Sequence, residues 1–267
     1  MHSLFAGLVL AAILGIATAS GQTYPSRPIT LIVPFPAGGA LDTIARALSE
    51  RMRVALGQPI VVENVPGGAG NVGVARLARA APDGYTADIG GWVTHVVNGA
   101  LYSLGFDVRT DFAPVSLIAT QPMLVVGKKA LAPENLRDLV DWLKQSPDRA
   151  LVGHAGVGTT GHISGLFFQQ HSGTRVQFVP YRGLGLAMQD LLAGHIDLIV
   201  DQAVNALPHV RSGAVRAYAV AAPSRLAAAP DVPTVDEAGL PGLYITSWQS
   251  LWLPKGTPAS RLGAATA

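Results

Sequence analysis

Residues 29–56 read ITLIVPFPAGGALDTIARALSERMRVAL, and this stretch decides the fold class. Its first part, residues 29–33, is a short apolar run rich in β-branched side chains, which two prolines and two glycines bring to an end. Apolar residues then recur at helical spacing as far as Ala55, and residues 60–63 form a second apolar run. Strand, glycine-rich loop, helix and strand therefore follow one another, which is typical of an α/β protein.

The same alternation continues along the chain. It predicts strands at 124–126, 150–153, 177–179, 196–200 and 215–220, with helices at 134–145, 162–171 and 185–193. Such an order favours a mainly parallel sheet with helices on both faces.

Two domains are expected from this order. A new series of strands and helices begins after Pro122, and we expect a strand at 247–253 to return to the first sheet. The first domain is predicted at 24–122, rejoined by about 248–267, and the second at 123–247. Because ligands of open α/β sheets bind beyond the carboxyl ends of the strands, two facing domains would enclose such a site.

The N-terminus predicts a cleaved signal peptide over residues 1–19. Residues 4–16 are almost unbroken apolar sequence, shorter than the roughly 20 residues of a membrane-spanning helix. Ala17-Thr18-Ala19 then supplies the small-x-small pattern of a cleavage site, so we expect cleavage between Ala19 and Ser20 and a periplasmic location. A buried N-terminal helix is the alternative.

Composition excludes several function classes. The chain has no cysteine, which rules out disulfides, a thioether lipid anchor and thiolate chemistry. Its 19 basic and 17 acidic residues form no basic block, so no nucleic-acid partner is expected. The histidines form no HExxH motif or other tight ligand pair, and no serine stands in a GxSxG elbow, so we expect no metal, no cofactor and no enzymatic activity.

Two glycine-rich loops are the candidate binding elements. Residues 34–42 lie between a strand and a helix, where the free N–H groups of the first helical turn favour an anion. Residues 154–162 repeat this arrangement and add the hydroxyls of Thr159 and Thr160, one of which is expected to donate to a carboxylate while the other caps the helix. The alternative for both loops is a tight structural turn, with Asp42 as a helix-start residue.

Three further residues follow predicted strands and are candidates for the rim of the cleft. Tyr181 and Arg182 come after the strand at 177–179, and Asp201 lies at the end of the strand predicted at 196–200. The alternatives are an exposed turn residue for Arg182 and a cap or hinge hydrogen bond for Asp201.

Ordered motifs from residue 24 to about residue 258 carry a family resemblance. They include YPSRPI at 24–29, VPFPAGG at 33–39, LGQP at 56–59, APDGYT at 81–86, VPYRG at 179–183 and APDVPT at 229–234. With this set the chain closely resembles the Bug receptors of tripartite tricarboxylate transporters.

The resemblance implies a type II periplasmic-binding-protein fold, in which two α/β domains close on a small carboxylate in the cleft between them. It also implies a monomer that delivers its ligand to transporter membrane subunits and catalyses nothing. The family's matching loops grip one carboxylate, which places ligand-binding roles on Phe35, Ala37, Gly39, Ala40, Asp42, Gly158, Thr159, Thr160, Tyr181 and Asp201. A secreted sensor for a membrane kinase and an α/β-cleft enzyme remain as alternatives.

Some positions depart from the family pattern. Val65 stands where Arg is usual, Asp88 interrupts a strand that is normally apolar, and Trp92 lies in a loop expected to look onto the cleft. Family members also continue well beyond the segment at 256–258, so we expect the 267-residue form to be less stable than an extended one.

Overall fold

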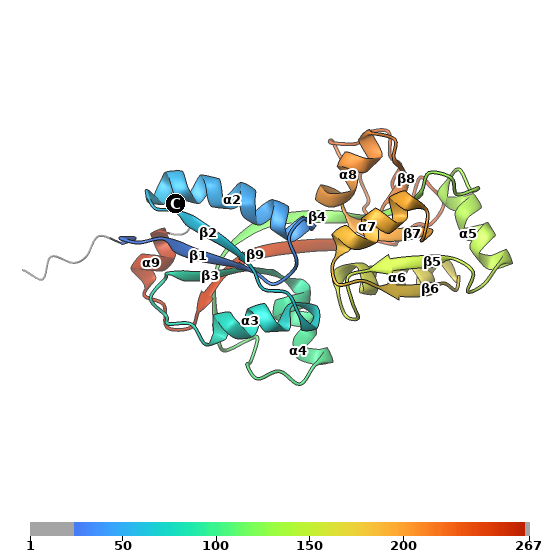
Figure 1. The fold of residues 1–267 in the computed structure, drawn as a ribbon. Coiled ribbons are helices and arrows are strands. Elements are labelled where there is room, and N and C mark those ends of the chain that lie inside the picture. Colours follow the sequence, from blue (N-terminus) through green and yellow to red (C-terminus); the bar gives the residue numbers. More distant parts are fainter. Residues whose placement is uncertain (1–23, 265–267) are drawn as a thin grey trace, which may run out of the picture.

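Residues 24–264 are described by the structure, a computed structural model, and they form two lobes joined by long strands (Figure 1). The predicted signal peptide at 1–19 lies outside the described residues. The first lobe contains β1 (Ile29–Val33), α2 (Ala40–Leu56), β2 (Ile60–Asn64), the 3-10 turn η1 (Gly68–Gly70), α3 (Asn71–Ala78), β3 (Thr86–Gly91), the π-helical turn η2 (Val93–Val97) and α4 (Asn98–Leu101).

The second lobe follows the long strand β4 (Phe112–Lys128). It contains α5 (Leu136–Gln145), β5 (Leu151–His154), α6 (Thr160–Ser172), β6 (Gln177–Pro180), α7 (Leu184–Ala193), β7 (Leu198–Gln202), α8 (Ala203–Arg211) and β8 (Val215–Val220). The chain then returns along β9 (Thr246–Pro254) to α9 (Ala259–Ala264) on the first lobe.

The sheet is mixed rather than mainly parallel, which corrects the expectation from the sequence. Its strand order is β2-β1-β3-β9-β4-β7-β5-β6, with β8 on β4. The pairs β1–β2, β1–β3, β5–β6 and β5–β7 are parallel, whereas every pair that includes β4 or β9 is antiparallel. The reason is the path of the chain, which leaves the first lobe along β4 and comes back along β9.

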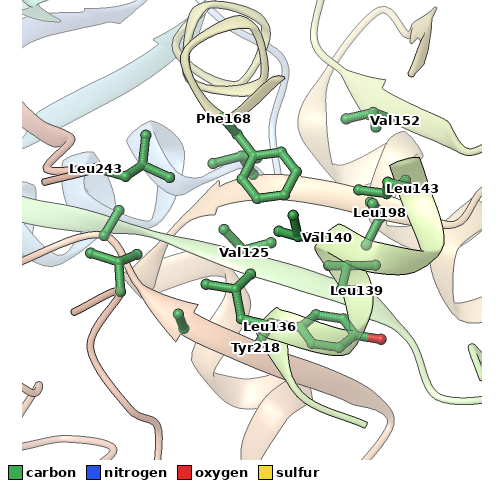
Figure 2. Close-up of a cluster of buried hydrophobic side chains, with 14 of the residues drawn as sticks. Val125, Leu136, Leu139, Val140, Leu143, Val152, Phe168, Leu198, Tyr218 and Leu243 are labelled. Atoms are coloured by element: carbon green, nitrogen blue, oxygen red, sulfur yellow. The ribbon is translucent and has the colours of Figure 1, made fainter. Parts of the chain in front are cut away.

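Helices cover both faces of each half of the sheet. Leu31 and Val33 of β1 pack with the apolar side of α2, while Ile32 between them packs with α3 on the opposite face. Because both faces are covered, β1 is apolar at successive positions instead of alternating with polar residues. Leu139 and Leu143 of α5 lie in the core of the second lobe with Leu136, Val140, Val125, Val152, Phe168, Leu198, Tyr218 and Leu243 (Figure 2).

The structure extends some predicted elements and adds others. The strand predicted at 124–126 is the end of the much longer β4, whose first half pairs with β9 and whose second half pairs with β7 and β8. The helix α8, which contains Pro208, was not predicted. The division into domains at 122/123 and 247/248 stays our proposal. Between residues 24 and 264, no helix has the length and apolar character needed to cross a membrane.

Candidate functional site

A cavity of about 70 Å³ lies between the two lobes, where the β1–α2 and β5–α6 loops meet. Since one ordered water needs about 10–15 Å³, the cavity has room for several waters or for a small organic molecule. No residue that lines it within the described chain carries a charge. The lining consists of Phe35, Pro36, Gly39, Ala40, Leu41, Gly91, Trp92, Val93, Thr94, Met123, Ala155, Thr159, Thr160, Gly161, Leu184, Gln202, Ser247, Trp248 and Gln249.

One end of the cavity is formed by the start of α2. The N-cap residue is Gly39, which has no side chain to cap the helix, and Ala40 and Leu41 follow in the first turn. The N–H groups of this turn therefore have no partner within the helix or from a cap. They provide donors, together with the positive end of the helix dipole, on the wall of an uncharged cavity.

Asp42 holds this loop in place from behind. Its carboxylate is buried and accepts hydrogen bonds from the Gly38 backbone N–H, the Arg46 Nε and the Asn64 Nδ2, each at 3.0 Å. Asn64 also donates to the Phe35 carbonyl at 3.0 Å. Burial opposes ionisation of Asp42, but these hydrogen bonds outweigh it and lower the pKa of the carboxyl. A charged Asp42 thus fixes the loop that carries the helix start.

The start of α6 contributes a second set of donors. Its N-cap is Thr159, whose hydroxyl donates to the Gly156 carbonyl at 2.6 Å and does not cap the helix. The first-turn N–H groups at Thr160 and Gly161 consequently have no cap and lie on the cavity wall. The N-terminal ends of two helices, one from each lobe, therefore line the same small cavity.

Two neutral histidines shape this second loop. The Nδ1 of His154 accepts from the Gly156 N–H at 3.1 Å, and the Nδ1 of His162 accepts from the Gly158 N–H at 3.2 Å. The centroids of the two imidazole rings lie 4.5 Å apart. Burial lowers the pKa of both imidazoles, which keeps them neutral and leaves each Nδ1 free to accept.

Two contacts join the lobes. The hydroxyl of Tyr102, after α4, donates to the Val157 carbonyl in the second loop at 2.7 Å. At the other contact, Gly183 at the start of α7 packs so closely on Pro36 that a Cβ atom there would lie 2.9 Å from the proline Cγ. The two lobes are therefore in direct contact at both of these points.

Three glutamines join the strands behind the cavity. Gln121 of β4 donates to Gln202 of β7 at 3.0 Å, and Gln249 of β9 donates to Gln202 at 3.3 Å and to Ser247 at 2.8 Å. Gln121 also accepts from the Val204 N–H at 3.0 Å. The amides of β4, β7 and β9 are thus linked where the two lobes join.

Half of the predicted site residues line the cavity, namely Phe35, Gly39, Ala40, Thr159 and Thr160. The others lie close by with different contacts. Ala37 is exposed beside Gly183 on an adjacent hollow, Asp42 lies behind its loop, and Gly158 packs on Leu101 and Tyr102.

Tyr181 and Asp201 do not line the cavity. Tyr181 donates to Asp190 at 2.7 Å, and burial, followed by this hydrogen bond, raises the pKa of its hydroxyl to about 12. Asp201 is fully buried and accepts from the Gln202 N–H at 2.7 Å and from Asn205 at 2.5 Å. Burial raises the pKa of Asp201 to about 7, against the effect of these hydrogen bonds. Arg182 is exposed and is not a lining residue either.

Sequence reasoning missed the wall that the crossing strands provide. Gln202, Ser247, Trp248 and Gln249 line the cavity but do not belong to either glycine-rich loop. The one feature of the sequence that pointed to these residues was the strand predicted at 247–253, which was expected to return to the first sheet. Trp92, singled out as a departure from the family pattern, does line the cavity as expected.

Comparison with known proteins decides the family. The sequence profile described as "Tripartite tricarboxylate transporter family receptor" matches residues 44–266. The chain belongs to this receptor family. Among its relatives, BugT of Bordetella pertussis is 34% identical to this receptor over 252 residues, which cover 93% of the chain and 77% of BugT.

Solved structures of similar proteins share the fold of this receptor. MatC from Rhodopseudomonas palustris, with bound malate, is 39% identical and superposes with a TM-score of 0.85, over 91% of this chain and 83% of MatC. Another R. palustris protein, with adipate, is 34% identical with a TM-score of 0.88, over 91% of this chain and 81% of the other. These findings confirm the predicted Bug resemblance and the periplasmic-binding-protein fold.

Proposed function

We propose that this receptor captures a small carboxylate between its two lobes in the periplasm and delivers it to the membrane subunits of a tripartite tricarboxylate transporter. The proposal has no catalytic step and no cofactor. It includes export by a signal peptide at 1–19 and a monomeric mature protein.

The observation that carries the proposal is the pair of uncapped helix starts on one uncharged cavity. Each helix N-terminus has the effect of about half a positive charge and presents N–H groups that nothing else in the helix can use. An anion between α2 and α6 would interact with both. The malate and adipate bound to the two R. palustris relatives support a carboxylate as that anion.

Within this proposal the predicted site residues divide by role. Phe35, Gly39, Ala40, Thr159 and Thr160 contact the ligand, while Ala37, Asp42 and Gly158 shape the two loops. Tyr181 acts as a support for α7 through Asp190, and Asp201 positions Gln202, whose backbone N–H it binds.

Proline substitution at the first helical position tests the backbone donors directly. Proline is favoured there because its missing N–H would lack a helical partner anyway, and the preceding residues Gly39 and Thr159 already have the extended backbone that proline requires. Ala40→Pro and Thr160→Pro should therefore leave the helices intact but weaken ligand binding. Thr160→Val removes only a hydroxyl and separates its contribution from that of the N–H group.

The measurement is a thermal-shift screen of small carboxylates, followed by calorimetry. Ligand at 100 times its Kd should add about 2.7 kcal/mol to the free energy of unfolding. Both proline variants should lose most of this gain, whereas Arg182→Ala should retain it. Normal binding by the proline variants together with loss of binding in Arg182→Ala would contradict the two-helix site. Co-purification with a membrane kinase instead of transporter subunits would favour the sensor alternative.

A further inference from the structure

The residues that line the cavity include three aromatic ones, Phe35, Trp92 and Trp248. Gly91, the last residue of β3, pairs with Gln249 of the antiparallel β9, so Trp92 follows directly after this pair on one chain segment and Trp248 precedes it on the other. Both residues line the cavity. A Cβ on Gly91 would lie 2.4 Å from the Trp248 carbonyl, so glycine is needed for the strands to approach this closely.

Trp248 is supported from behind by other rings. Its indole lies 6.5 Å from that of Trp252, measured between ring centroids, and Trp252 is in turn stacked on His95 at 4.4 Å with the planes only 4° apart. His95 is buried, as is the adjacent Phe112, whose ring lies 5.1 Å away. This row of rings holds Trp248 in place before a ligand arrives, and such preorganised aromatic surfaces bind flat apolar groups well.

The lining offers no cation to a second carboxylate, and the Trp92 Nε1 is its one buried polar side-chain atom without a hydrogen-bond partner among the described residues. Phe35, Met123 and Leu184 add apolar surface, and the lining of the described chain includes no Lys, Arg or His. The polar groups there are largely used by one another, since Gln249 donates to Ser247 and Gln202, and Gln202 also accepts from Gln121. A carboxylate away from the helix starts would lose its hydration without gaining a cation.

We propose that the cavity selects monocarboxylates with an uncharged aromatic body, with the carboxylate at the starts of α2 and α6 and the ring against Trp92 and Trp248. This inference rests on the proposed function and names its substrate class. It differs from the dicarboxylates bound to the two R. palustris relatives.

Calorimetry with benzoate, acetate, malate and adipate tests the proposal. Benzoate should bind about tenfold more tightly than malate or adipate, because only the dicarboxylates bring a second charge to the apolar wall. Trp248→Leu should weaken benzoate binding about fivefold to tenfold through loss of ring contact and leave the weak binding of acetate unchanged. Trp248→Phe, which keeps a ring, should retain most of the affinity for benzoate.

Tryptophan fluorescence provides a second readout. Benzoate should change the emission of the wild-type protein and of Trp142→Phe, since Trp142 packs against the core of the second lobe and not the cavity, but the change should be smaller in Trp248→Phe. Tighter binding of malate or adipate than of benzoate would overturn the inference, because it would mean that each helix start holds its own carboxylate. That result would leave the proposed function standing. An equal loss of benzoate and acetate binding in Trp248→Leu would also overturn it. If none of the four carboxylates bound, the proposed function would be overturned as well.

Discussion

Tyr102 of the first lobe donates a hydrogen bond of 2.7 Å to the carbonyl of Val157 in the second lobe. The bond is available only when the lobes are together, because its two ends belong to loops on opposite sides of the cleft. It therefore stabilises the closed form relative to the open one.

Tyr102→Phe should weaken ligand binding about fivefold. A hydrogen bond of this kind contributes about 1 kcal/mol, and here that contribution is specific to the closed form. The loss should appear mainly as faster ligand release in stopped-flow measurements. Tyr85→Phe is the matched control, since its hydroxyl interacts with Ser26 away from the cleft. Equal affinities of the two variants would contradict a role of Tyr102 in closure.

Gly183→Ala should oppose closure without affecting the fold of the second lobe. The residue has φ of −180°, an extended conformation that alanine adopts freely, but the new Cβ would lie 2.9 Å from Pro36 Cγ in the closed form. We expect weaker ligand binding and an unchanged melting temperature of the ligand-free protein. Gly105→Ala, where a Cβ meets no atom within 4 Å, is the control. A Gly183→Ala protein that binds as tightly as the wild type would argue against steric closure at this point.

Acidification should disorganise the second binding loop. Burial lowers the pKa of His154 and His162 from the ordinary value of 6.5. Below that value the unfolded chain takes up protons that the folded chain resists, so stability is fully present above pH 6.5 and falls as the pH drops through the lowered values. Protonation also removes the Nδ1 acceptors for Gly156 and Gly158, so ligand affinity should fall over the same range.

Calorimetric titrations between pH 8 and pH 5 measure this effect. The double variant His154→Gln with His162→Gln keeps a possible acceptor at each position but cannot titrate, so its affinity should depend less on pH. A pH dependence as steep as that of the wild type would assign the effect to other groups.

Asp88→Asn should make stability less sensitive to a rise in pH. Asp88 is fully buried on β3, neither carboxylate oxygen has a hydrogen-bond partner among the described residues, and His95 Nε2 is 3.7 Å away. Burial raises the pKa of Asp88 well above 3.8 and lowers the pKa of His95 to about 3, so burial favours the neutral form of both groups. The unfolded chain releases the Asp88 proton above pH 3.8, so the wild type loses stability as the pH rises toward the folded-state value.

Urea unfolding at pH 5, 6 and 7 tests this prediction. The stability of Asp88→Asn relative to the wild type should grow as the pH rises through this range, because burial raises the pKa of Asp88 in the folded protein. A constant difference across this range would show that the folded protein already carries an ionised Asp88.

The sequence predicted the parts of the site that are local in the chain. The two glycine-rich loops lie between a strand and a helix, and that order alone places the helix starts at the end of the sheet. Asp42 and Asp201 were harder to assign, because a carboxylate that stabilises its own loop has the same sequence position as one that faces a ligand. Only their hydrogen bonds to Gly38 and Gln202 distinguish the two roles.

The contribution of the crossing strands depends on contacts far apart in sequence. Trp248 and Gln249 enter the site because β9 pairs with β3 and β4, and no local pattern specifies that pairing. The first half of β4 was missed for a related reason. It contains Pro114 and Pro122 and lacks clear alternation, so its strand conformation depends on its partner β9.

The position of β9 also sets an order of assembly for the chain. This strand lies between β3 and β4 in the sheet of the first lobe, yet it is synthesised after the whole second lobe. The second lobe is contiguous from the second half of β4 to Ile245, the last residue of its core, and can form that core as soon as this segment has emerged. Residues 24–122 must wait for Thr246–Pro254 before their sheet is complete, so the lobe that is made first is the one that finishes folding last.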